Sequence, residues 1–281
     1  MIKIIADTTC CIPVKKMQEM GIDFVPQIIT FEDKSYRDDF ELSTESFLEK
    51  LRASKNLPGT AAPPPALYNP IYERIINAGD TALVISPSAK LSGTFRSATV
   101  AADDFNSEKI HIIDTKSMAG NLGTMVLKAK EWADQGMDIT ELTNRIQDMS
   151  AHDQTYFLVP TLEYLHKGGR IGGASKLIGT LLQVVPILTL RDGGIEVYDK
   201  VRSIKQATAN LVEINTSICK NNPMAYLTIG QCDSQALFES ISGQLKASLG
   251  YEEIPAFIAP PAIVVHAGPG LVVTSCFSQP G

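Results

Sequence analysis

The sequence predicts two domains, an N-terminal α/β domain with a mostly parallel sheet over residues 1–152 and a C-terminal α+β domain with a largely antiparallel sheet over residues 153–281. Three observations predict this organisation. The chain has 281 residues, which is enough for two separate cores. Strand-like and helix-like segments alternate until about residue 152, which is typical of a parallel sheet covered by helices on both faces. After residue 153, β-rich runs follow one another around tight turns, which favours antiparallel pairing.

Each element of the first domain follows from a local signal. Pro13 can open a short helix that Gly21 can close, and Ser43 is a typical N-cap before an acidic first turn. Asp138 or Thr140 can cap the last helix of this domain. The predicted elements are, in order, a strand at 2–6, a helix from 14, a strand at 23–31, a helix at 43–54, an extended Pro-rich connection at 57–68, a helix at about 66–78, a strand at 81–86, a helix through 95–105, a strand at 109–114, and helices at 117–136 and 138–149.

The second domain is predicted mainly from a hairpin and from short apolar runs. Residues 184–190 and 195–201 are β-rich and flank Asp192 and Gly193, a pair that favours a tight hairpin turn. The remaining predicted elements are strands at 155–159, 225–231, 254–258, 262–267 and 271–277, with helices at about 203–220 and 233–248. We expect a ligand cleft between the two domains, because small-molecule pockets often lie at domain boundaries.

Composition and charge exclude several classes of protein. The net charge is −6, which opposes non-specific attraction to nucleic acids. The longest apolar stretch, residues 177–190, is shorter than a membrane-spanning helix and is broken by Gln183 and Pro186. We therefore expect a cytoplasmic protein without a transmembrane segment and without a nucleic-acid partner.

Cysteine spacing and sequence motifs give no sign of a metal centre or of a common enzyme class. The five cysteines contain no CxxC pair and no Cys/His pair at metal spacing, so reduced thiols and no zinc site are expected. The sequence contains no GxGxxG, GxxxxGK[ST], HExxH or GxSxG motif. The acid-rich segment 31–43 lacks EF-hand spacing and is expected to be a solvated loop.

The segment after the predicted strand 81–86 could bind an anion. In an alternating α/β sheet, the loop after a strand opens towards the ligand side, and the next helix presents free N–H groups there. Ser92, Gly93 and Thr94 at such a turn could bind an oxyanion through N–H groups and a hydroxyl. Alternatively, Ser92 only caps the helix, a contribution of about 1 kcal/mol. On this segment alone, capping is the favoured interpretation.

Three further stretches carry polar residues beside unusual backbone signals. Thr60 lies in a loop bounded by prolines, and Arg170 follows two glycines in a segment too Gly-rich for a regular helix. His266 ends the apolar run 262–267 and precedes a Gly-Pro-Gly turn. Taken singly, each has an ordinary structural explanation, such as a core histidine or a plain turn.

These stretches belong to an ordered set of motifs, which are "IIADTTCCIP" (4–13), "GTAAPPP" (59–65), "ISPSAKLSGTFRSA" (85–98), "IIDTKSMAGNLG" (112–123), "TLEYLHKGGRIG" (161–172), "PIL" (186–188), "KVRSIKQA" (200–207) and "HAGPG" (266–270). Through this set the chain resembles the DegV family over essentially its full length. The sequence departs from the usual family pattern at Ala61, where a serine is common, and at Ala267, where a threonine is common. Both changes remove a hydroxyl.

The resemblance implies a non-enzymatic fatty-acid-binding protein, similar to the lipid-carrying subunit of bacterial fatty acid kinase. Such a protein has no catalytic residue, metal or cofactor of its own, and its ligand is a long-chain fatty acid held between two domains. A separate ATP-dependent fatty acid kinase subunit phosphorylates the carboxylate, and the acyl phosphate enters phospholipid synthesis; transient contact with a membrane surface fits this role. By matching motif, the ligand-binding residues are Thr60, Ser92, Gly93, Thr94, His266 and Gly268, and the partner or phosphate contacts are Arg170 and Arg202.

Two other functions remain open from the residues themselves. A serine acyl-ester hydrolase would use Ser92 as nucleophile and His266 as base, with Asp7 or Asp114 orienting the histidine. A binder of a small phosphorylated metabolite would use the same anion site.

Overall fold

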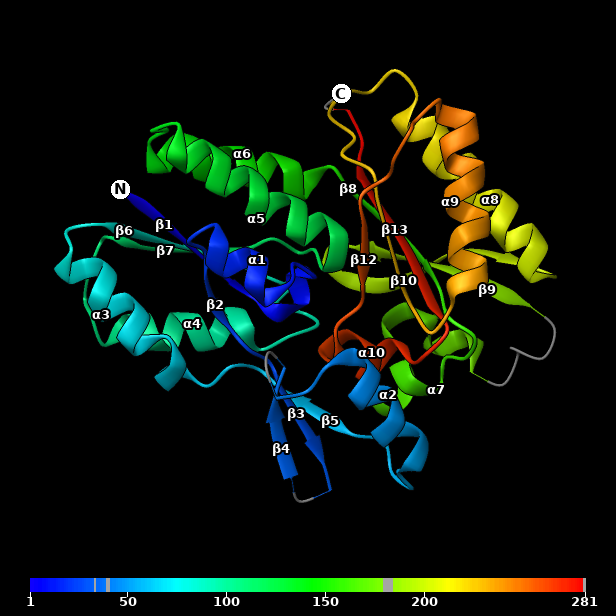
Figure 1. Cartoon of the computed structure of the whole chain (residues 1–281), viewed down its shortest axis with the longest axis horizontal. Helices are drawn as coiled ribbons and strands as arrows, with labels where there is room; N and C mark the ends of the chain where they lie inside the picture. The colour runs from blue at the N-terminus through cyan, green and yellow to red at the C-terminus, as the bar shows by residue number, and fades with distance from the viewer. Residues whose placement is uncertain (33, 39–40, 179–183, 280–281) are drawn as a thin grey trace. The chain divides into compact units, whose positions relative to one another are not determined.

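A computed structural model describes residues 1–32, 34–38, 41–178 and 184–279 of the chain (Figure 1). The chain divides into two compact units. Unit 1 consists of residues 1–118, 122–151 and 260–262, and unit 2 of residues 119–121, 152–259 and 263–281. Residues 179–183, within the longest apolar stretch, and residues 33 and 39–40, within the acid-rich segment, lie outside the described residues.

The main sheet of unit 1 is fully parallel, as predicted. It has the strand order β2-β1-β6-β7. The two central strands are almost entirely buried, which suits a parallel sheet with both faces covered. The four strands are β1 (Ile2–Asp7), β2 (Asp23–Val25), β6 (Thr81–Ser86) and β7 (Ile110–Asp114).

Helices flank this sheet, and Figure 1 shows α3 and α4 on the opposite side of it from α5 and α6. Tyr72 and Ile75 of α3 and Ala98 of α4 pack in one cluster with Ile5 and Val84 of the sheet. Asp138 caps α6, because its Oδ1 accepts from the backbone N–H groups of residues 140 and 141. The helices are α1 (Val14–Glu19), α2 (Thr44–Ala53), α3 (Asn69–Asn77), α4 (Thr94–Asp103), α5 (Ala119–Asp134) and α6 (Ile139–Ala151), with short 3₁₀ turns η1 (Thr8–Cys10) and η2 (Pro65–Leu67).

Unit 1 also contains a small antiparallel sheet that the sequence did not predict. Its order is β4-β3-β5, with β3 (Ile28–Phe31), β4 (Lys34–Arg37) and β5 (Gly59–Ala61). The expectation of a solvated loop over 31–43 is therefore wrong for residues 34–37, which pair with β3. The single strand expected over 23–31 is divided into β2 and β3 with Pro26 in the interval, since proline cannot donate to a ladder.

Unit 2 is built on a six-stranded sheet with the order β10-β9-β8-β13-β11-β12. Every neighbouring pair is antiparallel except β11 and β12, which confirms the largely antiparallel prediction. The predicted hairpin is confirmed as well, because β9 and β10 pair around Asp192 and Gly193, which both have positive φ. The strands are β8 (Asp153–Leu158), β9 (Val185–Arg191), β10 (Gly194–Val201), β11 (Thr228–Cys232), β12 (Ala256–Ile258) and β13 (Leu271–Phe277).

The helices of unit 2 include one segment that was expected to be a strand. Leu211 of α8 and Leu245 of α9 pack in one core cluster with Ile187, Ile229 and Val272 of the sheet. The strand predicted over 262–267 is wrong: Pro261 begins helix α10 (Pro261–Ala267), since proline is favoured in the first turn of a helix. The other helices are α7 (Glu163–Lys167), α8 (Ile204–Cys219) and α9 (Gln235–Leu249), with the 3₁₀ segment η3 (Gly172–Leu177).

Candidate functional site

The carboxyl ends of two neighbouring parallel strands meet in unit 1. Strand β1 ends at Asp7 and β6 ends at Ser86, and the two strands pair directly. After β6 the chain turns through residues 87–93 and enters α4 at Thr94. The side chain of Asp7 and the start of α4 therefore lie at the edge where ligands bind in parallel α/β sheets.

A hydrogen-bond network joins Asp7 to the start of α4. Oγ1 of Thr94 lies 2.9 Å from Oδ2 of Asp7 and 2.8 Å from Oγ of Ser92. Nε2 of Gln27, between β2 and β3, donates to Oδ2 of Asp7 at 2.5 Å and to Oγ1 of Thr94 at 2.8 Å. The other carboxylate oxygen of Asp7 accepts from the backbone N–H of Thr9 at 2.9 Å and also from the Thr9 hydroxyl. The network is buried, apart from the half-buried Ser92.

The Asp7 carboxyl is destabilised in its charged form. Burial raises its pKa above the usual 3.8, although the hydrogen bonds from Thr9, Thr94 and Gln27 act in the opposite direction. A perturbed carboxyl next to a polar loop is a frequent feature of functional sites.

Ser92 does not cap α4. The N-cap residue is Gly93, which has no capping side chain. Oγ of Ser92 accepts weakly from the backbone N–H of Thr94, at 3.3 Å, and its short contact is the one to the Thr94 hydroxyl. Capping therefore does not explain the position of Ser92, whose hydroxyl belongs to the Asp7 network.

Thr60 lies on strand β5 and not in a loop as the sequence predicted, and the segment after it packs on the start of the same helix. Its backbone pairs with Ile29 of β3, and its side chain is half-buried. A β-carbon added at Gly93 would lie 3.3 Å from Cβ of Ala62. The hydroxyl of Ser97 donates to the carbonyl of Pro63. The loop after Thr60 and the turn at residues 92–94 are therefore neighbours within unit 1.

His266 and Gly268 occupy a tightly packed corner of unit 2. Nδ1 of His266, on α10, lies against Gly168, where a β-carbon would overlap it. Gly268 has φ +80, and a β-carbon there would lie within 2.9 Å of the Tyr164 ring. Only glycine combines this φ with this contact.

The imidazole of His266 is neutral at physiological pH. Burial, and then the positive charge of Arg170, lower its pKa from 6.5 to about 4. Nη1 of Arg170 donates to the carbonyl of Gly168 at 2.7 Å, which holds the guanidinium beside the histidine. Unit 2 therefore offers one neutral imidazole and one permanent positive charge in the same corner.

Arg202 lies elsewhere in unit 2. It is exposed, immediately before the N-cap of α8, and its backbone N–H donates to Oε1 of Gln206 at 3.3 Å. An exposed guanidinium at this place is accessible to a partner or to a charged ligand.

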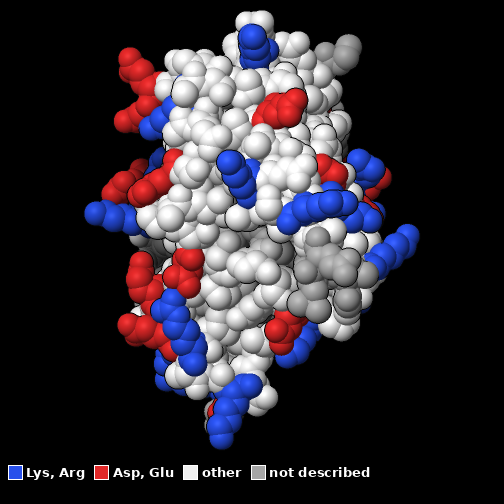
Figure 2. Space-filling model, turned by 90° about the vertical axis from the view of Figure 1, so that its right-hand side faces the viewer, with Lys and Arg blue, Asp and Glu red and all other residues white. Residues whose placement is uncertain are grey.

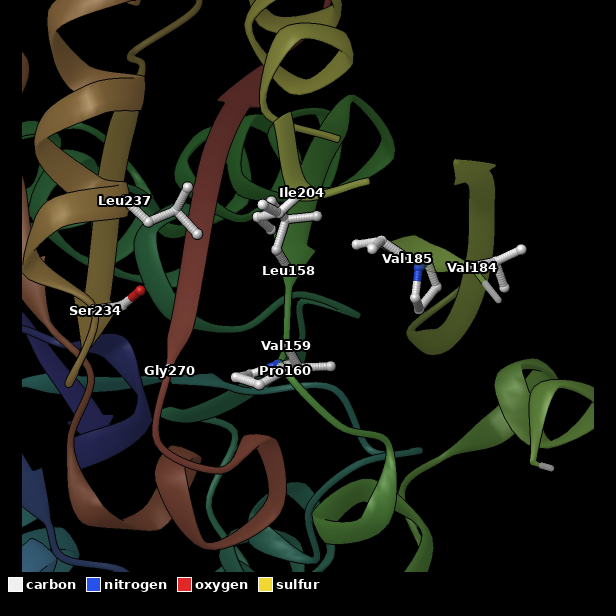
Figure 3. A pocket seen from close by; sticks show the side chains of 10 residues that line it. Leu158, Val159, Pro160, Val184, Val185, Ile204, Ser234, Leu237 and Gly270 are labelled. Atoms are coloured by element: carbon white, nitrogen blue, oxygen red, sulfur yellow. The ribbon is translucent and has the colours of Figure 1, made fainter. Parts of the chain in front are cut away.

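Unit 2 contains an apolar pocket of about 360 Å³ that sequence reasoning did not identify. This volume falls in the range of small-molecule sites, about 300–1,000 Å³. Figure 3 shows its lining side chains, among which Ser234 supplies the hydroxyl. The apolar lining includes Leu158, Val159, Pro160, Val185, Ile204 and Leu237.

The hydrolase interpretation needs Asp7 or Asp114 to orient its histidine, and both carboxylates accept hydrogen bonds from other groups. Within the described ranges, Asp114 accepts from the backbone N–H groups of Ala89 and Lys116, at 3.1 and 3.0 Å. Asp7 accepts from Thr9, Gln27 and Thr94.

Charged side chains do not gather into a patch of one sign on the visible surface. On the face shown in Figure 2, basic and acidic side chains are interspersed. Among the described residues, no group of three or more His, Cys, Asp or Glu side chains could hold a metal ion. No helix among them is long and apolar enough to cross a membrane.

A family model described as "Uncharacterised protein, DegV family" matches residues 1–278. The chain belongs to the DegV family. This confirms the resemblance inferred from the sequence. A DegV domain-containing protein of Deinococcus radiodurans is 32% identical over 276 residues, covering 96% of each chain. A DegV domain-containing protein of Streptomyces coelicolor is 33% identical over 277 residues, again covering 96% of each chain.

Solved DegV structures share the fold of the whole chain. A fatty-acid-binding DegV family protein from Thermus thermophilus has a TM-score of 0.91 at 28% identity and covers 99% of both chains. A fatty-acid-binding DegV family protein from Streptococcus agalactiae has a TM-score of 0.91 at 26% identity, covering 100% of this chain and 99% of its own. DegV from Bacillus subtilis, described as a fatty acid binding protein, has a TM-score of 0.88 at 27% identity and covers 99% of both chains.

Proposed function

We propose that this DegV protein is a cytoplasmic carrier that binds one long-chain fatty acid and presents its carboxylate to a separate kinase subunit. The observation that carries the proposal is the similarity, over 99% of the chain and with a TM-score of 0.91, to the fatty-acid-binding protein from Thermus thermophilus.

The tail of the acid is assigned to the apolar pocket of unit 2. Each CH₂ group transferred from water into such a pocket contributes about 0.8 kcal/mol, so a long chain binds well without further polar contacts. The volume of about 360 Å³ and the carbon-rich lining support this assignment.

The head group needs hydrogen-bond donors, because a carboxylate in an apolar environment costs several kcal/mol when it is not compensated. Unit 1 supplies the hydroxyls of Thr60 and Ser92 and the N–H groups of Gly93 and Thr94 at the start of α4, the latter bonded only weakly to Ser92 at 3.3 Å. The positive end of a helix dipole favours an anion there. The family pattern adds His266 and Gly268, which belong to unit 2.

The partner in this proposal is an ATP-dependent fatty acid kinase subunit. A carboxylate oxygen of the bound acid bonds to the γ-phosphorus of ATP, ADP leaves, and the acyl phosphate enters phospholipid synthesis. Arg170 and Arg202 are assigned to the kinase contact or to the charge that develops on the transferred phosphoryl group, since guanidinium groups suit both tasks.

Native mass spectrometry tests the carrier function directly. Protein purified without added lipid should show the mass of one long-chain acid, which is released when the protein is denatured. Samples that contain no acid and that also fail to bind one on titration would contradict the proposal.

A double variant tests the assigned hydroxyls. Thr60→Ala with Ser92→Ala should weaken fatty-acid binding roughly 5- to 100-fold, the effect of losing one or two hydrogen bonds to a charged group. The matched control is Thr140→Ala with Ser217→Ala, at exposed positions of α6 and α8, which should bind like the wild type. Equal affinity in the two double variants would remove Thr60 and Ser92 from the site.

A further inference from the structure

Asp7 is a carboxyl group enclosed by uncharged partners. Its side chain is 1% exposed. Across the described residues, its hydrogen bonds come from Thr9, Gln27 and Thr94, and it forms no ion pair. Such a group is expected to change its protonation state rather than hold an uncompensated charge.

The titratable side chains around Asp7 supply no positive charge. Burial, and to a smaller extent the negative charge of Asp7, raise the pKa values of Cys10, Cys11 and Tyr68. These groups are neutral near pH 7. The other nearby carboxylate is that of Asp38, which also raises the pKa of the Cys11 thiol. None of these neighbours supplies a positive charge, so among them Asp7 can be neutralised only by taking up a proton.

The number of protons in the network fixes the direction of its hydrogen bonds when Asp7 is ionised. The Thr94 hydroxyl has one proton and two lone pairs, and Gln27 donates to one of these lone pairs. An ionised Asp7 only accepts, so the Thr94 proton must point to it. The 2.8 Å contact between Ser92 and Thr94 then requires Ser92 to donate. In this state Ser92 has no proton left for a ligand.

Protonation of Asp7 reverses these bonds. Asp7 then donates to Oγ1 of Thr94, Thr94 donates to Oγ of Ser92, and the Ser92 proton becomes free to point outwards. A carboxylate ligand is itself only an acceptor, so it gains a hydrogen bond from Ser92 in this state alone.

We propose that Asp7, Thr94 and Ser92 form a proton relay, through which the binding of each fatty-acid anion is accompanied by the uptake of one proton at Asp7. Asp7 and Thr94 act as positioning residues, since they set whether Ser92 donates or accepts. The inference rests on the proposed function, because it takes the carboxylate of the acid to lie at Ser92.

The proton balance of the relay is closed. If the acid enters in its neutral form, its proton passes to Oγ of Ser92, the Ser92 proton passes to Oγ1 of Thr94, and the Thr94 proton passes to Oδ2 of Asp7. Each hydroxyl gains one proton and loses one, and the bound acid becomes a carboxylate. If the acid enters as an anion, Asp7 acquires the same proton from the solvent.

His266 is the competing proton acceptor. Its pKa in the unliganded protein is about 4, and a bound anion beside it would favour the imidazolium form. A test of the relay must therefore separate proton uptake at Asp7 from uptake at His266.

Isothermal titration calorimetry with decanoate, in buffers that differ in their enthalpy of ionisation, measures this uptake between pH 6 and pH 9. For the wild type we expect about one proton per bound anion above the pKa of Asp7, with Kd rising about tenfold per pH unit there. Thr94→Val interrupts the relay and frees the Ser92 proton, so its uptake should vanish and its Kd should become nearly independent of pH.

Two further variants complete the design. Thr94→Ser keeps the hydroxyl and should retain the uptake, and His266→Gln should retain it as well, with weaker binding. If Thr94→Val does not fold, Asp7→Asn replaces it, with the same expected loss of uptake. Binding without proton uptake in the wild type, or unchanged uptake in Thr94→Val, overturns the relay alone. If neither decanoate nor palmitate binds at any pH, the proposed function fails together with it.

Discussion

Nδ1 of His266 lies 2.3 Å from the position that a β-carbon at Gly168 would occupy. Such a β-carbon would also lie 2.9 Å from the carbonyl oxygen of Tyr164, so the backbone on that side leaves no room either. The imidazole thus occupies the space left by the lack of a side chain at residue 168, next to the guanidinium of Arg170.

Gly168→Ala should therefore displace His266. We expect fatty-acid affinity to fall roughly five- to tenfold, the value of one hydrogen bond, and the His266 pKa to move up towards 6.5 as the ring leaves its buried position. Titration calorimetry and NMR titration of the imidazole measure the two effects. Gly243→Ala, where a β-carbon would have no neighbour within 4 Å, is the control. An unchanged His266 pKa in Gly168→Ala would contradict the positional role of this glycine.

His266 should also make stability depend on pH. Its pKa is lowered from 6.5 to about 4 in the folded protein, so between these values the unfolded chain binds more protons. The free energy of unfolding should accordingly fall as the pH is lowered from 6.5 towards 4. In His266→Gln, the free energy of unfolding should fall by roughly 1–3 kcal/mol less than in the wild type over this pH range. Urea denaturation at several pH values measures the difference. A parallel pH dependence in variant and wild type would show that other groups cause it.

A larger side chain at Val185 should shorten the space available to the ligand tail. Val185 lines the apolar pocket at the start of β9. We expect Val185→Phe to weaken the binding of long-chain acids roughly ten- to hundredfold, and that of decanoate much less. The same substitution at Val100, an exposed residue of α4, is the control. Equal losses for long and short acids would place the tail elsewhere.

Arg202→Ala should separate kinase contact from acid binding. Because Arg202 is exposed, its removal should leave fatty-acid affinity unchanged while lowering acyl-phosphate formation with the kinase subunit roughly tenfold, the effect of one charge-assisted hydrogen bond. Lys205→Ala, at another exposed cation three residues along the chain, is the matched control. Weaker acid binding in Arg202→Ala would assign this arginine to the ligand instead.

The regular elements were predictable where a local signal exists. The Asp192–Gly193 hairpin, the Asp138 cap and the alternating strands and helices of unit 1 all depend on neighbouring residues. The segment 262–267 shows the limit of this approach. Its short apolar run is buried as a helix, and periodicity alone cannot separate a buried strand from a buried helix of this length. The preceding Pro261 was the signal that could have decided it.

The site was only partly accessible to sequence reasoning. Thr60, Ser92 and His266 were selected because they stand in recognisable motifs, and their assignment to the ligand stays a prediction. Gln27 stands in no motif and acquires its role only because the chain between β2 and β3 meets the start of α4. The apolar pocket consists of residues such as Leu158 and Leu237, which in a sequence cannot be distinguished from ordinary core.

The way in which the chain is shared between the units limits how such a protein can be divided. Asn121, in a helix that otherwise belongs to unit 1, donates to the carbonyl of Cys276 in unit 2. The backbone N–H of Ala262, far along the sequence, donates to Asp38 in unit 1. A gene fragment cut near residue 152 would thus give each half an incomplete set of its own contacts. Chimaeras that combine halves of two relatives should therefore fold only when residues 119–121 come from the same relative as the C-terminal half, and residues 260–262 from the same relative as the N-terminal half.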